Sequence, residues 1–177
     1  REKVVITIDP ADARDFDDAI SVRSLADGWE LAVHIADVSH YVKPDTAIDH
    51  EARKRGNSTY LVDRVLPMLP EQLSNGICSL VPGEDRLTRC AVMHFDRKGK
   101  MVRSRFEQAI IRSHCRLTYD DAQTVLDAGG EETGVVLNEI EALLNECWAL
   151  AGVLRRRRFS EGALDLDFPE VRMELDE

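Results

Sequence analysis

Five aspartates crowd a short stretch near the start of the chain and restrict how that stretch can fold. Within the segment TIDPADARDFDDAI they are Asp9, Asp12, Asp15, Asp17 and Asp18, and Arg14 is the local countercharge. Two like charges about 4 Å apart repel by about 4 kcal/mol at an effective dielectric near 20. The stretch must therefore either spread its carboxylates into water or gather them around a cation.

Strand-like segments flank this stretch. The run KVVITI at 3–8 is β-branched, and AISVRSL and WELAVHIADV form a predicted hairpin with its turn at Asp27-Gly28. A second hairpin is predicted from RLTRCAVMHFD, the turn RKGK, and MVRSRFEQAIIRSH. The aspartates therefore fill a loop between strands.

Two short helices are predicted between the hairpins. Asp45 or Thr46 can cap a helix through AIDHEARKR, and Gly56 would end that helix. Pro70 suits the first turn of a short helix, PEQLSN, closed by Gly76.

After Tyr119 the pattern changes to helix. Apolar residues recur at steps of three and four and predict one long amphipathic helix that ends near RRRRFSEG: Val136, Ile140, Leu143, Leu144, Cys147, Leu150 and Leu154. The predicted fold class is α+β, with antiparallel strands first and amphipathic helices after them.

The composition fits one globular unit. The chain has 177 residues and is 44% hydrophobic, and no internal repeat or linker divides residues 1–177. No apolar run approaches the roughly 20 residues that cross a bilayer, so we expect a cytoplasmic protein without a membrane partner. The widely spaced cysteines are predicted to be free thiols: Cys78, Cys90, Cys115 and Cys147. The histidines show no zinc-site spacing.

The net charge has the wrong sign for a freestanding protein that grips a phosphate backbone. There are 33 acidic and 23 basic residues, and the net charge is −10. Either no polyanion binds, or metal ions and further segments supply positive charge. The chain opens directly into a strand and stops in PEVRMELDE, so we expect a piece of a longer protein.

A cation at the aspartate stretch competes with a simpler interpretation. A calcium EF-hand is excluded, because from Asp9 the alternate positions hold Ala11 and Ala13 and no central glycine follows. A solvated acidic loop remains possible on composition alone. However, Phe16 would draw part of the loop toward a core, where unpaired carboxylates are costly. Mg²⁺ takes oxygen ligands and would neutralise the cluster, a combination suited to phosphodiester hydrolysis.

Several motifs in register carry a family resemblance. TIDPADARDFDDAI, HIADVSHYV, EARKRGNSTYLVDRVLPMLPEQLSNGICSL and HCRLTYDDA together resemble the catalytic RNB domain of the ribonuclease II and ribonuclease R family of exoribonucleases. The match runs from Thr7 to about Ala122, and a weaker likeness continues to the end.

The resemblance implies a function and a set of site residues. Family members are hydrolases that degrade single-stranded RNA processively from the 3′ end with Mg²⁺, releasing nucleoside 5′-monophosphates. The catalytic and metal-binding aspartates fall on Asp9, Asp15, Asp17 and Asp18, with two ions in a complete site, and the aromatic clamp for the terminal nucleotide falls on Tyr60. Asp12 occupies a variable position of the motif.

The resemblance also implies missing parts. The family has a downstream arginine in a TSPIRRY-like motif and a glutamate on an internal helix, and neither context occurs here. The chain is thus expected to be a partial RNB domain, its amino-terminal half, inactive alone. Its partners would be the rest of the catalytic domain and the cold-shock and S1 modules.

Other residues leave alternatives open. The arginines 155–158 either bind phosphate or complement the helix dipole. Asp37 is either a neighbour of the site or a turn cap, and Asn75 and Gly76 are most simply a helix stop. Two rival functions remain: a relative that binds RNA or a partner without cleaving, and a structural domain whose acidic loop only binds cations.

Overall fold

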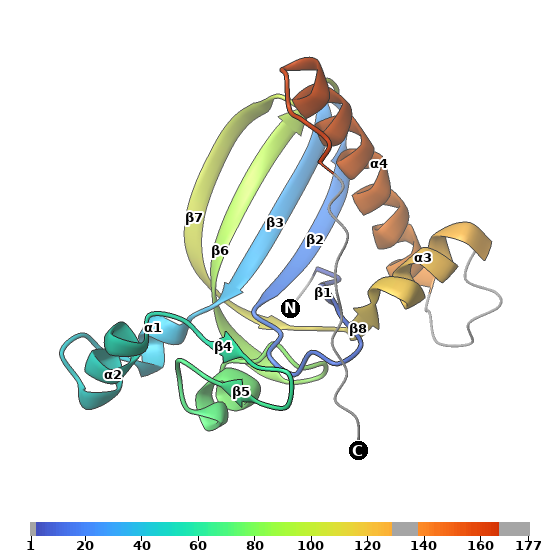
Figure 1. Cartoon of the computed structure of the whole chain (residues 1–177). Coiled ribbons are helices and arrows are strands. Elements are labelled where there is room, and N and C mark those ends of the chain that lie inside the picture. The colour runs from blue at the N-terminus through green and yellow to red at the C-terminus, as the bar shows by residue number, and fades with distance from the viewer. Residues whose placement is uncertain (1–2, 129–137, 167–177) are drawn as a thin grey trace.

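One curved sheet organises the molecule, with two helices along one side of it and a smaller lobe at one end (Figure 1). The computed structural model describes residues 3–128 and 138–166. In spatial order the strands of this sheet are β7 (Met101–Arg112), β6 (Asp85–Asp96), β3 (Gly28–Ala36), β2 (Asp18–Leu25), β1 (Ile6–Asp9) and β8 (Cys115–Thr118). The lobe carries α1 (Val38–Tyr41), α2 (Ala47–Arg55), β4 (Thr59–Tyr60), β5 (Val65–Leu66) and the short helix η1 (Gln72–Ile77). The remaining helices are α3 (Tyr119–Ala128) and α4 (Asn138–Ser160).

The two edge strands of the sheet are consecutive in the chain. Only Ser113 and His114 separate β7 from β8, and β8 pairs in parallel with β1 at the opposite edge. The His114 backbone N–H donates to the Val5 carbonyl at 2.8 Å, and the Val5 N–H donates to His114 Nδ1 at 3.1 Å. These bonds draw one end of the sheet together. As a result, the carboxyl ends of β1 and β8 lie side by side, with Asp9 opposite Thr118.

Each face of the sheet buries a separate apolar cluster. Helices α3 and α4 cover one face, where the core consists of Ile6, Leu117, Ala122, Val125, Ile140, Leu143 and Leu144. On the other face, called the far face below, the cluster is Val5, Ala19, Ala36, Cys78, Leu80 and Ile111. Neighbouring residues Val5 and Ile6 belong to different clusters because side chains alternate along a strand.

The α+β prediction is confirmed, with one addition. The two predicted hairpins form β2–β3 and β6–β7, both antiparallel. The β1–β8 pairing is parallel and was not expected. Strands β4, β5 and β8 and helix α1 were also missed, since four residues or fewer carry almost no periodicity.

The first hairpin turns one residue earlier than predicted. Leu25 pairs with Gly28, so Ala26 and Asp27 form the turn. Gly28 lies inside β3, where a Cβ atom would stand 1.8 Å from the Phe95 carbonyl oxygen of β6. Close packing of two strands, and not a turn, therefore requires this glycine.

The predicted helix boundaries are partly correct. Thr46 caps α2 by accepting a hydrogen bond from the Asp49 N–H, and Gly56 ends α2 with a φ of 79°. The PEQLSN prediction is partly correct, because Gly76 breaks the helix with non-helical torsions, while η1 continues past this kink to Ile77. The long helix is present as α4, whereas Val136 lies outside the described residues.

Two further expectations concern cysteines and membranes. All four cysteines are free: Cys78, Cys90, Cys115 and Cys147. Within 3–128 and 138–166, none of the helices combines the length and the hydropathy needed for a membrane span.

Candidate active site

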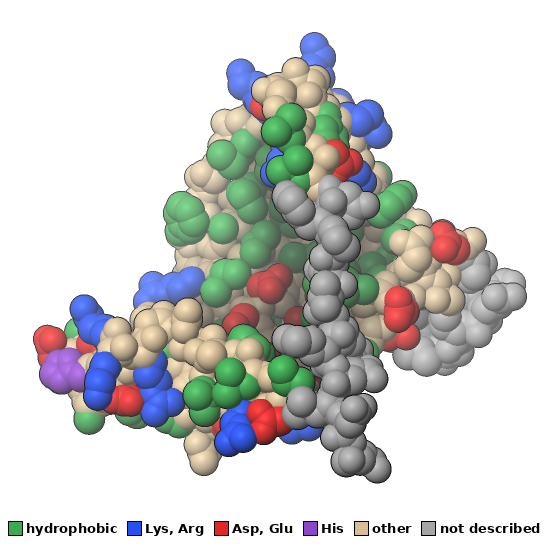
Figure 2. Space-filling view, in the orientation of Figure 1, with side chains coloured by type: hydrophobic (Ala, Val, Ile, Leu, Met, Phe, Trp, Pro, Cys, Tyr) green, Lys and Arg blue, Asp and Glu red, His purple; other side chains and the backbone are tan. Residues whose placement is uncertain are grey.

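The aspartate loop, residues 10–17, joins two neighbouring strands at one end of the sheet. Asp9 is the last residue of β1 and Asp18 the first of β2, and these strands pair antiparallel through Ile6 and Ile20. The two aspartates thus lie at the same end of the sheet, at the start and finish of the connection between β1 and β2. In the space-filling view, acidic side chains gather in a hollow between the sheet and the lobe that carries β4 and β5 (Figure 2).

Residues far away in the sequence hold the aspartate loop. Arg116 Nη2 of β8 donates to the carbonyl oxygens of Pro10 at 2.6 Å and Ala11 at 2.9 Å, and its guanidinium lies 5.3 Å from the centre of the Phe16 ring. Ser79 Oγ accepts from the Phe16 N–H at 3.1 Å and donates to the Arg14 carbonyl at 3.2 Å.

The end of the aspartate loop is bonded to the backbone on both sides. The Leu80 N–H donates to the Phe16 carbonyl at 2.9 Å, and the Ala36 N–H donates to the Asp17 carbonyl at 2.9 Å. The loop is therefore held at its beginning by Arg116 and at its end by two neighbouring segments.

Four of the five aspartates act on one another. Burial raises the pKa of Asp9, and the carboxylates of Asp18 and Asp15 raise it further. The pKa of Asp17 is raised by desolvation, although the residue is exposed, and by Asp15, Asp18 and Asp9. These charge effects place Asp9, Asp15, Asp17 and Asp18 in one region, although no three of their oxygen atoms lie within 4.8 Å of one another. Asp12 is exposed and is not among the groups that shift Asp9 or Asp17.

The donor set suits a hard divalent cation. Asp9 is only 9% exposed, and its Oδ2 atom is buried without a hydrogen-bond partner among the described residues. A carboxylate oxygen in this state, beside three further carboxylates, is costly unless a cation or a proton neutralises it. The residues present therefore fit an oxygen-coordinated ion such as Mg²⁺.

Tyr60 shares a pocket with this loop. A pocket of about 270 Å³ is lined by Asp12, Ala13, Arg14, Asp15, Ser58, Tyr60, Val65, Pro67, Glu71, Ser74 and Asn75. The Tyr60 side chain is 69% exposed, so it is not a core tyrosine in this chain. The structure thus brings together Tyr60 and Asp15, which are far apart in the sequence.

The sequence patterns gave no role at the site to three residues of this region. Arg116 and Ser79 hold the aspartate loop, and Asn75, which precedes the kink at Gly76, lines the Tyr60 pocket. All three lie inside the quoted motifs HCRLTYDDA and LSNGICSL, but nothing in their local pattern shows that they reach the aspartates.

Asp37 forms an ion pair. Its carboxylate accepts from Ser39 Oγ at 2.6 Å and pairs with Arg89 Nε at 3.0 Å, and it makes no side-chain cap bond to α1. These contacts give the buried Asp37 carboxylate a structural explanation.

The arginines at the end of α4 have several partners. Arg155 pairs with Asp165 at 3.0 Å, and Arg157 pairs with Glu161 at 2.8 Å and donates to the Gly99 carbonyl. Their place in the last turns of α4 favours the helix-dipole interpretation.

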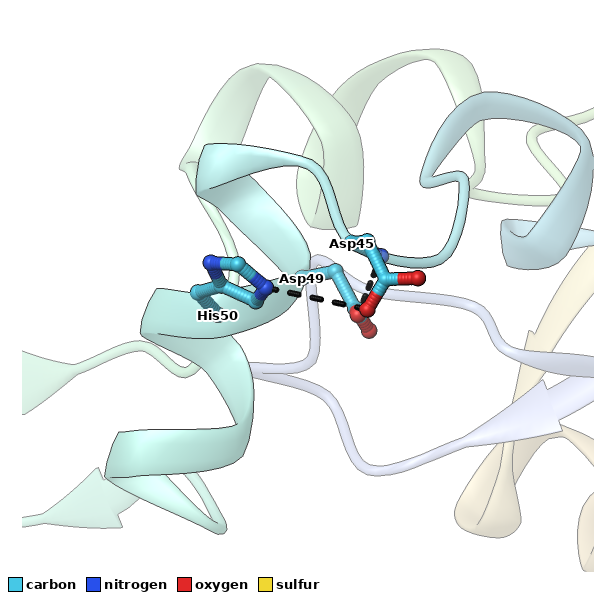
Figure 3. A group of neighbouring side chains, drawn as sticks. All are labelled: Asp45, Asp49 and His50. Carbon is cyan, nitrogen blue, oxygen red and sulfur yellow. Dashed lines mark hydrogen bonds and ion pairs between the residues drawn. The ribbon is translucent and has the colours of Figure 1, made fainter.

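Among the described residues, ligand atoms of three side chains come within 4.8 Å of one another at the start of α2 and not in the aspartate loop. Oxygen and nitrogen atoms of Asp45, Asp49 and His50 lie within 4.8 Å of one another (Figure 3). The Asp45 side chain is 91% exposed, and Asp49 already accepts hydrogen bonds from the Asp45 N–H and from Arg53. The closeness of these three side chains is explained by the hydrogen bonds of the first turn of α2.

Comparison with known proteins identifies the family. The RNB domain model matches residues 1–177. Ribonuclease R of Thermotoga maritima is 48% identical over 182 residues, which cover 100% of this chain and 25% of that protein. Ribonuclease R of Vibrio parahaemolyticus is 44% identical over 173 residues, covering 97% of this chain and 21% of that protein.

A solved structure agrees with the sequence relatives. Mycoplasma genitalium RNase R in complex with double-stranded RNA superposes with a TM-score of 0.90 at 34% identity, covering 99% of this chain and 31% of that chain. The present chain spans about a quarter of the length of the ribonuclease R relatives it matches. Motifs, fold and relatives agree that this chain belongs to the RNB domain family.

Proposed function

We propose that the full-length protein containing this chain is a 3′ to 5′ exoribonuclease. It hydrolyses single-stranded RNA processively and releases nucleoside 5′-monophosphates in the cytoplasm. The observation that carries this proposal is the placement of four aspartates, Asp9, Asp15, Asp17 and Asp18, at the junction of β1 and β2 in a chain of the RNB family. Relatives named ribonuclease R support the same activity.

Each aspartate has a proposed role. Asp9 and Asp18, which begin and end the connection between β1 and β2, hold the first Mg²⁺ ion. Asp17 and Asp15 serve the second ion or orient the attacking water. When bound, Mg²⁺ polarises the phosphoryl group and lowers the pKa of a coordinated water. The unpartnered Oδ2 of Asp9 supports its assignment as a ligand.

Tyr60 holds the terminal nucleotide. Its exposed ring faces a pocket shared with Asp15, so a base stacked on the ring would lie near the carboxylates. Stacking of a base on an aromatic side chain is worth about 1–3 kcal/mol and does not depend on sequence. That property suits an enzyme that moves along any RNA.

The rest of the full-length protein supplies what this chain lacks. With a net charge of −10, the chain needs basic partners to hold an RNA backbone. We assign this role to the remaining catalytic domain, which would also contribute an arginine and a glutamate, and to cold-shock and S1 modules. The chain alone should therefore bind Mg²⁺ weakly and show little ribonuclease activity.

A cleavage assay on the full-length protein tests this proposal. A single-stranded RNA labelled at its 5′ end is incubated with the protein, with and without Mg²⁺. We expect the labelled RNA to be shortened from its 3′ end to a short end product without accumulated intermediates, and 5′-monophosphates to be released, only with the ion. RNA binding without products would instead indicate a non-cleaving relative. If RNA is not bound at all, the aspartate loop only binds cations in a structural domain.

A further inference from the structure

Two buried polar side chains on the far face of the sheet lack hydrogen-bond partners. Thr7 is 0% exposed and His34 is 6% exposed. Thr7 Oγ1 and both ring nitrogens of His34 have no partner among the described residues. Buried polar atoms in folded proteins are nearly always paired with protein or with ordered water. Both side chains therefore require a partner that the described residues do not supply.

Strand register places these two side chains in one row. His34 of β3 is opposite Ala19 of β2. Because Ile6 is opposite Ile20, the next residue of β1, Thr7, also comes opposite Ala19. Alternation along each strand puts Thr7 on the same face as Val5 and His34 on the same face as Ala36, and Val5, Ala19 and Ala36 share one cluster. Thr7 and His34 therefore face the same space from either side of Ala19.

The neighbours of the His34 imidazole within the sheet are small side chains. Ala19 and Cys90 are the cross-strand neighbours of His34, and Ala32 and Ala36 are its neighbours on the same face of β3. Two strand spacings separate Thr7 from His34, or about 9.5 Å between backbones. With only the Ala19 methyl group between them, the hydroxyl and the ring do not meet directly. A small polar molecule between them could bond to both.

The burial of Thr7 Oγ1 and the His34 ring nitrogens restricts what can form hydrogen bonds with them. Their surface is already covered within this chain, so further domains of the full-length protein do not reach them. A water molecule is small enough, and buried waters typically bond two to four otherwise unpaired polar groups. Burial also lowers the pKa of His34 to about 4, with a contribution from Lys3, so its ring is neutral. A neutral imidazole offers one donor and one acceptor.

We propose that ordered water bridges Thr7 Oγ1 and His34 beneath the candidate metal centre, making Thr7 and His34 positioning residues for Asp9. Thr7 and Asp9 are two residues apart on β1 and point to the same face. The Thr7 hydroxyl and the Asp9 carboxylate each have a buried oxygen atom without a hydrogen-bond partner among the described residues. A water that orients the Thr7 hydroxyl would also orient the Asp9 carboxylate, from the side away from the candidate metal centre. The orientation of Asp9 rests on the proposed function, whereas the presence of the water between Thr7 and His34 does not.

The water is tested by a crystal structure of the full-length protein at a resolution that shows ordered solvent. We expect one or more waters within hydrogen-bond distance of Thr7 Oγ1 and of a His34 ring nitrogen. In the Thr7→Val variant, which keeps the shape and removes the hydroxyl, that water should be lost or displaced. The proposal would be overturned if the His34 ring bonds directly to a protein atom, or if no ordered water lies between Thr7 and His34 in the unmodified protein.

The link to Asp9 is tested by calorimetric titration with Mg²⁺ in the absence of RNA. Thr7→Val should weaken Mg²⁺ binding about tenfold, the size expected for partners that orient a ligand. Thr7→Ser, which restores the hydroxyl, should bind nearly as the unmodified protein does. Thr124→Val is the matched control, because the Thr124 hydroxyl donates to the Asp120 carbonyl on α3, away from this row.

The two experiments separate the possible failures. If Thr7→Val melts normally and binds Mg²⁺ as tightly as the unmodified protein, Thr7 does not position Asp9 and that step is wrong. If Thr7→Val loses stability, Thr7→Ser decides, since weakened binding in this folded variant would also contradict the hydroxyl role. If the unmodified protein binds no Mg²⁺, the metal assignment fails together with the link, and the crystallographic water is judged alone.

Discussion

Arg116 Nη2 donates a 2.6 Å hydrogen bond to the carbonyl oxygen of Pro10, the first residue of the aspartate loop. The same nitrogen donates to the Ala11 carbonyl at 2.9 Å, and the guanidinium lies over the Phe16 ring. One side chain of β8 therefore contacts both halves of a loop more than a hundred residues away in the sequence. Together with the bonds of Ser79, Leu80 and Ala36 to the end of the loop, these contacts fix the stretch that carries Asp15 and Asp17.

Replacing Arg116 should impair catalysis more than RNA binding. Arg116→Lys keeps the charge but loses the planar group that reaches two carbonyls and stacks on Phe16. A displacement of about 1 Å at a reacting group can lower the rate about a hundredfold. Single-turnover cleavage by the full-length variant should show a loss of that order, with RNA affinity nearly unchanged. Arg53→Gln, which breaks an exposed pair with Asp49, is the control and should have no effect on cleavage.

Removing one carboxylate distinguishes a metal site from a solvated loop. Asp17→Asn keeps the side chain's size and removes one charge, so cleavage at saturating Mg²⁺ should fall by orders of magnitude. RNA affinity should persist or rise, and the metal-free protein should be slightly more stable because repulsion is reduced. Asp12→Asn is the matched control and should change the rate less than about tenfold. Equal single-turnover rates for all three proteins would contradict the metal-site assignment.

The Tyr60 ring should determine how short the final products become. Tyr60→Ala in the full-length protein should weaken the hold on short RNAs and lengthen the end products, as read on a sequencing gel. Tyr60→Phe keeps the π face and should be mild. An unchanged product ladder together with a sharply lower melting temperature would show that Tyr60 is a packing residue.

The buried Glu30 should make stability depend on pH in the acidic range. Burial opposes its ionisation, but hydrogen bonds from Lys3 and Arg23 prevail and lower the pKa of Glu30 to about 2. A lowered native pKa stabilises the fold above the ordinary value of 4.5, and this contribution is lost as the pH falls toward about 2.

Glu30→Gln tests this dependence by urea unfolding of the full-length protein. At pH 6 the variant should lose about 3 kcal/mol, because the lowered pKa of the Glu30 carboxylate corresponds to a stabilisation of about that size. The difference between the two proteins should shrink between pH 4.5 and 2. A difference that is constant across this range would show that ionisation of Glu30 does not stabilise the fold.

Gly28→Ala should destabilise the sheet although the residue sits near a turn. The new Cβ atom would stand 1.8 Å from the Phe95 carbonyl oxygen, so β3 and β6 must separate. We expect a loss of about 3 kcal/mol in thermal unfolding. Gly152→Ala is the matched control within α4, where the nearest atom is the flexible end of Arg156 at 3.4 Å. This control should be neutral or stabilising by up to about 1 kcal/mol.

Local sequence patterns predicted most of the regular elements. Alternation and β-branched residues predicted β2, β3, β6 and β7, and the step of three and four apolar residues predicted α4. A cap at Asp45 or Thr46 and a stop at Gly56 were predicted for α2, and Thr46 proved to be the cap. These signals work because strand alternation, helical periodicity and capping each depend on residues a few positions apart. The motifs also indicated the family and the four aspartates.

The arrangement of the site depends on pairings that no local pattern records. Arg116 reaches Pro10 because β8 returns to pair with β1, and Ser79 reaches Phe16 from another segment. Tyr60 shares a pocket with Asp15 for the same kind of reason. Gly28 shows the limit of local patterns at a single residue. Its sequence context predicted a turn, whereas its close packing against Phe95 is what requires a glycine. Burial, pKa shifts and unpartnered atoms arise from such distant contacts, so they follow from the assembled sheet and not from the order of the residues.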